Sequence, residues 1–258
     1  FQAEDGIRDS STSRGLGDVY KRQILEDLIE KTGLDLDANS IDLLQKEKEV
    51  QLLSSIDIHK VAHLFTNPES YFFRSLAHLE LVKKMSTEKT RIWFAGCSTG
   101  QEVYSASLML SSISDKTLVG TDLSSKYIER ALSGSFFVFR KSEIKSFEKY
   151  KLLPQCHLST NKNKKSVDVK FSSIKREGIS FDTHNLMDGP YSEGFDIVFC
   201  RNVLLHMTTS GAKKALASLK DGVKIGGLLI PGDTDPNIFE DNWERKKHNN
   251  VIFWKKKW

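Results

Sequence analysis

The strongest constraint on the fold is a change in the spacing of apolar residues near Arg91. Beyond this residue the chain contains short apolar runs of strand length: "RIWFA", "TLVGTD", "ISFDTHN", "FDIVFC" and "GGLLIP". Helical segments separate several of them, namely "EVYSASLMLSS", "SSKYIERALS" and "SGAKKALASLKDG". Strands that alternate with helices predict an α/β fold, in which helices cover both faces of a mostly parallel sheet.

One interruption of this alternation predicts an inserted subdomain. The stretch "CHLSTNKNKKSVDVKFSS" contains two strand-like segments around a polar tip of Asn and Lys residues. We therefore expect a β-hairpin subdomain at about residues 155–178, within an α/β domain that spans residues 86–258. The final stretch, "NVIFWKKKW", predicts a last strand that could form an edge of the sheet.

The chain before the sheet has a helical pattern and predicts a small N-terminal domain over residues 24–85. Apolar residues of "ILEDLIEKTG" share one helix face, and Gly33 is placed to end that helix. Ser40 can cap a second helix. Pro68, within "TNPESYFFR", should interrupt any continuous helix.

The first 23 residues, "FQAEDGIRDSSTSRGLGDVYKRQ", need a separate interpretation. They start with Phe rather than Met, are polar, and show no helical or strand periodicity. They also resemble the translated sequencing-adapter read-through found at the ends of assembled reading frames. We therefore exclude residues 1–23 from the fold as a non-native segment, with a disordered tail as the alternative. On either interpretation we expect the native start to be missing.

Composition and charge exclude several classes of protein. The 258 residues are 39% apolar and 28% charged, a balance typical of a globular protein. No apolar run approaches the roughly 18 residues of a transmembrane helix, so we expect no membrane insertion. The net charge of +4 favours an acidic partner, but the Lys-rich runs lack interleaved aromatic residues, so we expect no nucleic-acid partner. Three widely spaced cysteines without a CxxC motif argue against disulfides and zinc, and favour a reducing cytoplasm.

Glycine and polar residues follow the predicted strands at the points where a ligand would bind. In open α/β sheets, ligands lie beyond the C-terminal ends of the strands. The first such end, "AGCSTG", has Gly96 and Gly100 for a tight turn, while Ser98 and Thr99 can cap the next helix. This loop has neither the GxGxxG spacing of NAD-binding folds nor the Lys of a P-loop.

The second strand end carries Asp122, 22 residues after the last glycine of that loop. An acidic residue at this distance is placed to accept hydrogen bonds from ribose hydroxyls. The alternative is a helix N-cap, which Ser124 could supply equally well. Later strand ends carry Asn185, which could bond an adenine edge, and Arg201 with Asn202 at the mouth of the cleft. Taken singly, these residues could instead be turn formers and a surface cation.

Six motifs occur in order along the chain: "TNPESYFFR", "WFAGCSTGQEVYS", "GTDLS", "HNLMDGP", "FDIVFCRNVLLHM" and "GGLLIPGDTD". Together they resemble the CheR-type chemotaxis receptor methyltransferases, which use S-adenosyl-L-methionine (SAM) to esterify glutamate side chains of chemoreceptors. The resemblance covers about Ile24 to Trp254. It implies a Rossmann-like class I methyltransferase sheet with a small all-helical N-terminal domain and an inserted β-hairpin subdomain. It also implies a cytoplasmic monomer whose partner is the cytoplasmic domain of a methyl-accepting chemoreceptor.

The resemblance also assigns site residues, motif by motif. The cofactor contacts of the family fall on Asn67, Ser70, Arg74, Gly96, Glu102, Asp122, Asn185, Leu186, Arg201 and Asn202. The assignment of Asn67 depends on the spacing between Asn and "FFR", which varies within the family. The catalytic positions are Arg74, which can pair with the carboxylate of the cofactor, and His206, near the transferred methyl group. No metal is implied.

The expected reaction is displacement at the methyl group of a sulfonium by a carboxylate oxygen. A glutamate is already ionised at neutral pH, so no general base is needed and the enzyme contributes orientation and a dry site. Cys97 could be a nucleophile at a helix N-terminus. Because methyl transfer needs no covalent intermediate, we interpret it instead as a small residue packed beneath the cofactor.

Departures from the family pattern leave alternatives open. His206 replaces a tyrosine; it is either a hydrogen-bonding substitute, which we prefer, or a base for an amine or hydroxyl acceptor. Gln101 replaces the first of two acids, and "GDTD" stands in place of "GHSE". The alternatives are a diverged CheR-like methyltransferase with another acceptor, or a non-catalytic module that binds SAM or a receptor.

Two further features have plain interpretations. His59 and His63 have the i,i+4 spacing of a metal-binding pair, but no further ligand accompanies them, so we expect a solvated helix face. At the predicted hairpin tip, Lys162, Lys164 and Lys165 could contact an acidic receptor segment, or could form a solvated loop.

Overall fold

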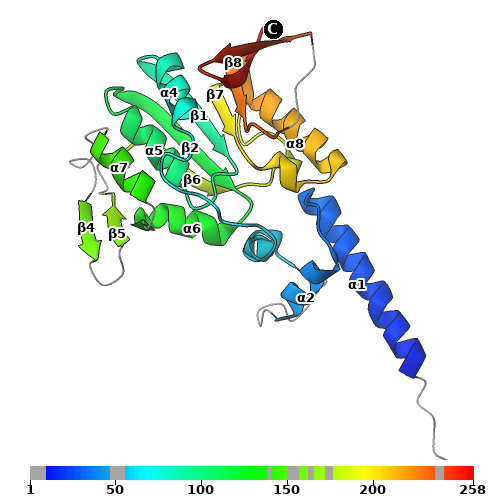
Figure 1. Cartoon of the computed structure of the whole chain (residues 1–258). Helices are drawn as coiled ribbons and strands as arrows, with labels where there is room; N and C mark the ends of the chain where they lie inside the picture. Colours follow the sequence, from blue (N-terminus) through cyan, green and yellow to red (C-terminus); the bar gives the residue numbers. More distant parts are fainter. Residues whose placement is uncertain are drawn as a thin grey trace, which may run out of the picture.

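The computed structural model describes residues 10–46, 56–138, 141–149, 157–161, 166–171, 177–235 and 241–258. Its largest element is a seven-stranded sheet in the order β6-β2-β1-β7-β8-β10-β9 (Figure 1). The strands are β1 (Lys89–Ala95), β2 (Asp115–Asp122), β6 (Ile179–Thr183), β7 (Phe195–Cys200), β8 (Val223–Pro231), β9 (Trp243–His248) and β10 (Val251–Lys256). Pairings from β6 to β8 are parallel, and β10 pairs antiparallel with β8 and with β9. The predicted α/β class is confirmed.

The last strand of the chain does not lie at an edge of this sheet. β10 pairs with β8 on one side and with β9 on the other, so β9 forms the edge. The sequence of β9, "WERKKH", is mostly charged and lacks the apolar alternation that marks a strand. Charged side chains on an edge strand discourage pairing with a further strand, which explains this composition.

Helices cover both faces of the sheet, and side chains that alternate along β1 build a core on each face. Ile92 and Phe94 belong to the core that also contains residues of α4 (Leu76–Met85), α5 (Gln101–Met109) and α6 (Ser125–Ser133). Trp93 and Ala95 belong to the opposite core, with residues of α8 (Thr209–Gly222). Burial on both faces is what the continuous apolar strand sequences require.

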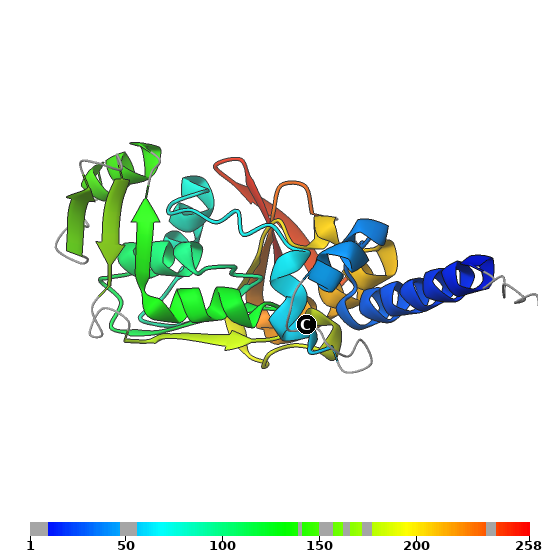
Figure 2. The ribbon, with the colours of Figure 1, turned by 90° about the horizontal axis from the view of Figure 1, so that it is seen from below.

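The inserted subdomain is larger than the predicted hairpin. Strands β4 (His157–Asn161) and β5 (Ser166–Lys170) form that hairpin, but β3 (Ser135–Val138) joins them in a sheet of order β3-β5-β4. Helix α7 (Lys141–Lys149) packs beside it, since Phe147 belongs to the same core as Phe136 of β3. Figure 2 shows this subdomain at the opposite end of the molecule from α1. The hairpin tip, which could be a receptor contact or a solvated loop, lies outside the described residues with its Lys162, Lys164 and Lys165.

The N-terminal part consists of α1 (Ser10–Thr32), α2 (Ala38–Lys46), α3 (Ile58–Val61) and a short 3-10 helix, η2 (Ala62–Leu64). Its own small core contains Ile24, Leu28, Ile41, Leu44 and Val61. Gly33 ends α1 as predicted, with a left-handed φ of 69° and its N–H donated to Ile29 O at 2.7 Å. Ser40 does not cap α2, because it lies inside the helix; Asp37 instead accepts the Ser40 N–H at 3.2 Å.

Two expectations about this region differ from the structure. Residues 1–23 showed no periodicity, yet from Ser10 onward the chain is helical, so the described part of that segment is not a disordered tail. Once the packed half of α1 has formed, the cost of helix nucleation has been met. Each further residue then adds one hydrogen bond, so the helix can extend beyond its packed half. Moreover, α4 lies within the predicted domain 24–85, but its Leu79 and Val82 are buried in the α/β core.

Within the described residues, no helix is both long and apolar enough to cross a membrane.

Candidate active site

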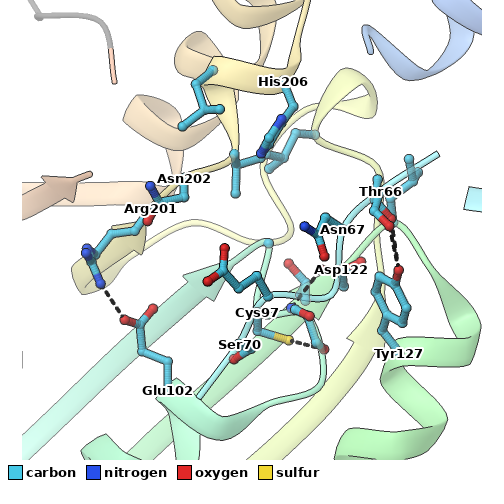
Figure 3. Close-up of a pocket in the computed structure, with 18 of the residues that line it drawn as sticks. Thr66, Asn67, Ser70, Cys97, Glu102, Asp122, Tyr127, Arg201, Asn202 and His206 are labelled. Carbon is cyan, nitrogen blue, oxygen red and sulfur yellow. Dashed lines mark hydrogen bonds and ion pairs between the residues drawn. The ribbon is translucent and has the colours of Figure 1, made fainter. Parts of the chain in front are cut away.

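A cavity of about 360 Å³ lies at the C-terminal ends of β1, β2, β6 and β7 (Figure 3). This volume is within the range of sites that bind small molecules. The structure brings together around it all of the predicted site residues: Asn67, Ser70, Arg74, Gly96, Glu102, Asp122, Asn185, Leu186, Arg201, Asn202 and His206. Elements distant in sequence therefore converge on one site, and the roles assigned to the individual residues stay predictions.

The β1–α5 loop forms the floor of the cavity. Gly96 has a left-handed φ of 71°, and a Cβ there would clash with Val203. Ser98 and Thr99 do not cap α5, contrary to expectation, because Gly100 occupies the N-cap position with a φ of 89°. The Ser98 hydroxyl is instead buried with no hydrogen-bond partner among the described residues, and Ser98 lines the cavity. A ligand hydroxyl, amine or carboxylate could satisfy it.

Cys97 is packed rather than activated. Its side chain is buried, and its Sγ lies close to Gly120. Burial raises the pKa of the Cys97 thiol, and the nearby Asp122 carboxylate raises it further. The thiolate, which is the nucleophilic form, is therefore disfavoured. This geometry supports the packing interpretation of Cys97.

Asp122 is held in place by the backbone of two neighbouring loops. Its Oδ2 accepts the Ser98 N–H at 2.8 Å, and its Oδ1 accepts the Ser124 N–H at 3.0 Å. Ser124 itself caps α6, so the alternative of Asp122 as N-cap is wrong. Burial raises the pKa of Asp122, and these backbone N–H groups oppose the shift. A carboxylate has about four acceptor positions, so both oxygens retain a lone pair for ligand hydroxyls.

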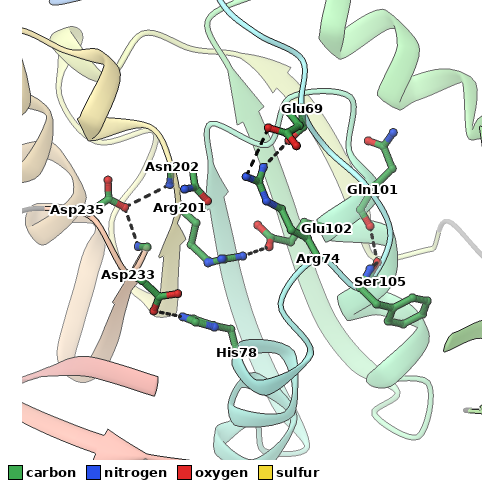
Figure 4. A network of polar contacts seen from close by, with 12 residues as sticks. Glu69, Arg74, His78, Gln101, Glu102, Ser105, Arg201, Asn202, Asp233 and Asp235 are labelled. Atoms are coloured by element: carbon green, nitrogen blue, oxygen red, sulfur yellow. Dashed lines mark hydrogen bonds and ion pairs between the residues drawn. The ribbon is translucent and has the colours of Figure 1, made fainter. Parts of the chain in front are cut away.

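A buried ion pair flanks the cavity (Figure 4). Arg201 Nη1 donates to Glu102 Oε1 at 2.8 Å, and the side chains are only 5% and 18% exposed. Burial raises the pKa of Glu102, while Arg201 and then Arg74 oppose this shift. Behind the pair, burial and the charge of Arg201 lower the pKa of His78 to about 4. His78 is therefore neutral at neutral pH, so the charged groups of this network that line the cavity are the paired Arg201 and Glu102.

The side chain of Asn185, which is predicted to bind adenine, already makes two hydrogen bonds within the protein. Its Oδ1 accepts the Met187 N–H at 3.1 Å, so it caps the short helix η5 (Leu186–Asp188). Its Nδ2 donates to Lys31 O at the end of α1, at 2.7 Å. The side chain thus ties the end of β6 to the N-terminal helix, and one amide hydrogen and one acceptor position of Oδ1 remain for a ligand. The cap of η5 by Asn185 matches the alternative interpretation of this residue as a turn former.

His206 lies at the rim, with its ring directed toward the cavity (Figure 3). It ends the short helix η6 (Leu204–His206), and its side chain is exposed. The chain that follows α1 fixes this turn: Asp35 N–H donates to His206 O at 2.9 Å, and Leu34 forms a β-bridge with Met207. No sequence pattern predicts this contact between the N-terminal region and the His206 turn.

Residues 66–74, which we call the strap, border another side of the cavity, and six of them line it: Thr66, Asn67, Glu69, Ser70, Tyr71 and Arg74. Tyr127 of α6 holds one end, because its hydroxyl donates to Thr66 O at 2.8 Å. Arg74 lies at the other end, donates to the carbonyl oxygen of Glu69, and lies 4.0 Å from the Glu69 carboxylate. The side chain of Arg74 is 26% exposed, so this cation is accessible from the cavity.

Sequence reasoning missed several of the residues that line the cavity, among them Thr66, Tyr127 and Leu205. Tyr127 could have been found, since it lies one turn into the helix that follows Asp122. Leu205 is an apolar side chain that is 44% exposed at the cavity, beside His206. The preceding Val203 and Leu204 are also apolar, so the pattern alone could not distinguish Leu205 from a core residue.

His59 and His63 do not form a solvated pair. His59 Nδ1 lies 2.9 Å from Leu123 O, and Ser125 Oγ donates to His59 O at 3.2 Å. The α-helix that contains His59 ends at Val61, so both imidazoles are not on one regular helix face. His63 Nδ1 lies 2.8 Å from Lys60 O. His59 therefore helps to dock the N-terminal helices against α6.

Comparisons with known proteins identify the family. The family model "CheR methyltransferase, SAM binding domain" matches residues 68–252, which is more than half of the chain. The chain belongs to the CheR methyltransferase family. It is 26% identical over 211 residues to "Chemotaxis protein methyltransferase" of Listeria innocua, covering 74% of this chain and 73% of that protein. With the protein of the same name from Borreliella burgdorferi, identity is 28% over 235 residues, covering 82% and 77%.

A solved structure, the "DhpI-SAH complex structure", is similar at 15% identity and a TM-score of 0.38, covering 70% of this chain and 66% of that one. The family match, rather than this similarity, establishes that the CheR chain is a SAM-dependent methyltransferase. The cavity fits SAM, because it offers a buried carboxylate, Asp122, for hydroxyl groups and a cation, Arg74, for a carboxylate. The buried Ser98 Oγ and Arg201 Nε, unpartnered among the described residues, are further groups that a polar ligand could satisfy.

Proposed function

We propose that this CheR protein transfers the methyl group of SAM to glutamate side-chain carboxylates of chemoreceptors. The observation that carries the proposal is the nature of the cavity rim. Asn67, Leu205 and His206 line the cavity and are exposed, so a side chain on another protein can approach from outside. The name of the curated relatives, "Chemotaxis protein methyltransferase", supports chemoreceptors as that partner. We place the reaction in the cytoplasm, on the cytoplasmic domain of the receptor.

The side chains around the cavity are suited to a carboxylate acceptor. When bound, SAM supplies a methyl group on a sulfonium. A glutamate acceptor is ionised at neutral pH and needs no proton removed. The chain then has three tasks: Asp122 and Arg74 orient the cofactor, the strap limits access of water, and His206 positions the acceptor. The carboxylate of Glu69 near Arg74 suggests that this cation can also attract an acceptor carboxylate.

The experiment is methyl transfer from SAM labelled in its methyl group to membranes that carry chemoreceptors. We expect label on the receptor that alkali releases as methanol, because a glutamyl methyl ester is base-labile. Matched controls are a receptor whose acceptor glutamates are changed to glutamine and the enzyme variant Asp122→Asn, both expected to show little label. Label that survives alkali would move the acceptor to nitrogen and contradict the proposal.

His206 gives the test a second arm, because the family has a tyrosine at this position. If His206 only positions the acceptor through a hydrogen bond, His206→Tyr should keep kcat within about threefold of the wild type, since a phenol is also a donor and acceptor. If His206 is a base for an amine or hydroxyl acceptor, the same substitution should abolish transfer, because an unperturbed Tyr titrates near about pH 10. Loss of more than about 100-fold, the usual range of general-base catalysis, would favour the diverged methyltransferase.

A further inference from the structure

A buried carboxylate of the inserted subdomain holds the strap beside the SAM cavity. The Phe72 N–H donates to Glu143 Oε1 at 2.7 Å. Glu143 lies in the first turn of α7 and is only 5% exposed. The next residue along the strap, Phe73, donates its N–H to Ser105 Oγ of α5 at 3.0 Å. Two successive backbone amides of the strap are thus fixed by side chains of different elements.

The aromatic rings of the strap are embedded in the same subdomain. The Phe72 ring centroid lies 5.1 Å from that of Phe136 on β3 and 5.1 Å from that of Phe147 on α7, both edge to face. Phe73 contacts Phe147 in the same manner, at 5.3 Å. Such contacts add to the free energy gained from burial and set ring orientation. The strap therefore packs on the inserted subdomain as well as on the main sheet.

Phe73 has a backbone conformation that needs this support. Its φ is 56°, in the left-handed region that non-glycine residues with a bulky side chain rarely adopt. Such a conformation persists only where the surrounding structure holds it. The next residue is Arg74, and residues 66–71 on the other side of Phe72 include Asn67 and Ser70 of the cavity. The position of these side chains therefore depends on the anchor at Phe72 and Phe73.

We propose that Glu143 is a positioning residue for SAM binding, through which the inserted subdomain sets the conformation of the strap. Glu143 does not line the SAM cavity; it acts through the Phe72 N–H and thereby on Arg74. The subdomain then has a second task besides any contact with a receptor: it keeps the cofactor side of the site preorganised. This inference concerns cofactor binding alone and is independent of the nature of the acceptor.

The test is SAM binding by calorimetry, without any acceptor. For Glu143→Ala we expect the Kd for SAM to rise about tenfold, equivalent to about 1.4 kcal/mol. Glu143→Gln retains an acceptor oxygen for the Phe72 N–H, so its Kd should stay within about twofold of the wild type. Hydrogen exchange of a peptide that covers residues 66–74 should also become faster in Glu143→Ala than in Glu143→Gln.

Two control variants separate this role from general destabilisation. Val169→Ala removes buried methyl groups from the same subdomain but keeps the Glu143–Phe72 bond, so it should lower Tm without changing the Kd for SAM. Lys145→Ala, at an exposed position of α7, should change neither quantity. If Glu143→Ala does not fold, Glu143→Asp keeps the carboxyl group but shortens the side chain, and it should weaken SAM binding in the same direction. A folded Glu143→Ala or Glu143→Asp with wild-type affinity and wild-type exchange of the strap would overturn the proposal.

Discussion

If Asp122 binds the cofactor as predicted, this single buried carboxylate should make the affinity for SAM depend on pH. Burial raises its pKa above the ordinary Asp value of about 3.9. Only the ionised form offers both oxygens to ribose hydroxyls, so SAM affinity should fall as pH decreases through the raised pKa. The effect of pH on folding has the opposite sign to its effect on SAM affinity. Because the pKa of Asp122 is raised in the native state, this state binds the proton more tightly than the unfolded chain does. Protonation of Asp122 as pH falls therefore increases the free energy of unfolding.

Calorimetric Kd values for SAM from neutral pH down to about pH 4, close to the ordinary Asp pKa, check this prediction. Asp122→Asn should bind SAM more weakly at neutral pH and should lose the part of the pH dependence that Asp122 causes. The variant keeps the size of the side chain, so a comparison with the wild type separates Asp122 from Glu102, whose pKa is also raised by burial. Identical pH profiles for the two proteins would exclude Asp122 as the titrating group.

At the scale of single residues, the sequence predicted which side chains meet but not what holds them. Gly96, Asp122 and Arg201 follow predicted strands, and parallel strands bring their C-terminal ends to one edge, so their convergence could be expected. The partners of Asn185 could not be, because Lys31 O lies 154 residues away and offers only a backbone carbonyl. The same is true of Glu143, whose partner is the Phe72 N–H. Every residue has a backbone carbonyl, and every residue except proline has a backbone N–H, so the sequence cannot indicate which of these groups a distant side chain will contact.

At the scale of elements, the junction between α1 and α8 holds the His206 turn. Thr208 N–H donates to Gly33 O at 2.9 Å, and Asp35 N–H donates to His206 O at 2.9 Å. The approach is close: a Cβ at Gly211 would clash with Gly33 O and would lie 2.7 Å from Gly33 Cα. Gly211 is thus a glycine because α1 and α8 approach with their backbones in contact.

Gly211→Ala should force these two elements apart. We expect the free energy of unfolding to fall by about 1–3 kcal/mol, the usual cost of overpacking. Methyl transfer should fall as well, because the turn that carries His206 loses its backbone partners. Urea unfolding and kcat measure the two effects. Ser210→Ala, at an exposed neighbouring position of α8, is the matched control and should behave as the wild type. Normal stability and normal kcat in Gly211→Ala would show that the junction tolerates separation.

Helices and strands whose apolar residues recur at regular spacing were predicted from the sequence, and those without such spacing were not. Strands β1, β2, β7 and β8 have continuous apolar runs because both of their faces are buried there. The edge strand β6 instead alternates half-buried and exposed positions. In contrast, β9 is a charged edge strand, and β3 has only four residues, so neither has enough pattern to be recognised. The described part of residues 1–23 is helical without an apolar stripe, as a helix extending away from the body of the molecule can be (Figure 1).

At the scale of the whole molecule, the cavity that we assign to SAM depends on three parts of the chain. The sheet supplies Asp122 and Arg201, the N-terminal region holds Asn185 and the His206 turn, and the inserted subdomain anchors the strap. The order of elements along the sequence predicted that these parts exist. Their mutual contacts arise only in the folded chain, so the sequence could not show that all three converge on the cofactor site.

The central claim is that this cavity binds SAM, and titration calorimetry tests it most directly. Titration of SAM into the whole chain should show about one site per molecule, and Asp122→Ala should raise the Kd at least about tenfold, or about 1.4 kcal/mol. Asp182→Ala, which removes an exposed carboxylate from the neighbouring strand β6, should leave the Kd unchanged. The absence of binding by the wild-type chain, or equal affinity in Asp122→Ala and the wild type, would contradict the account.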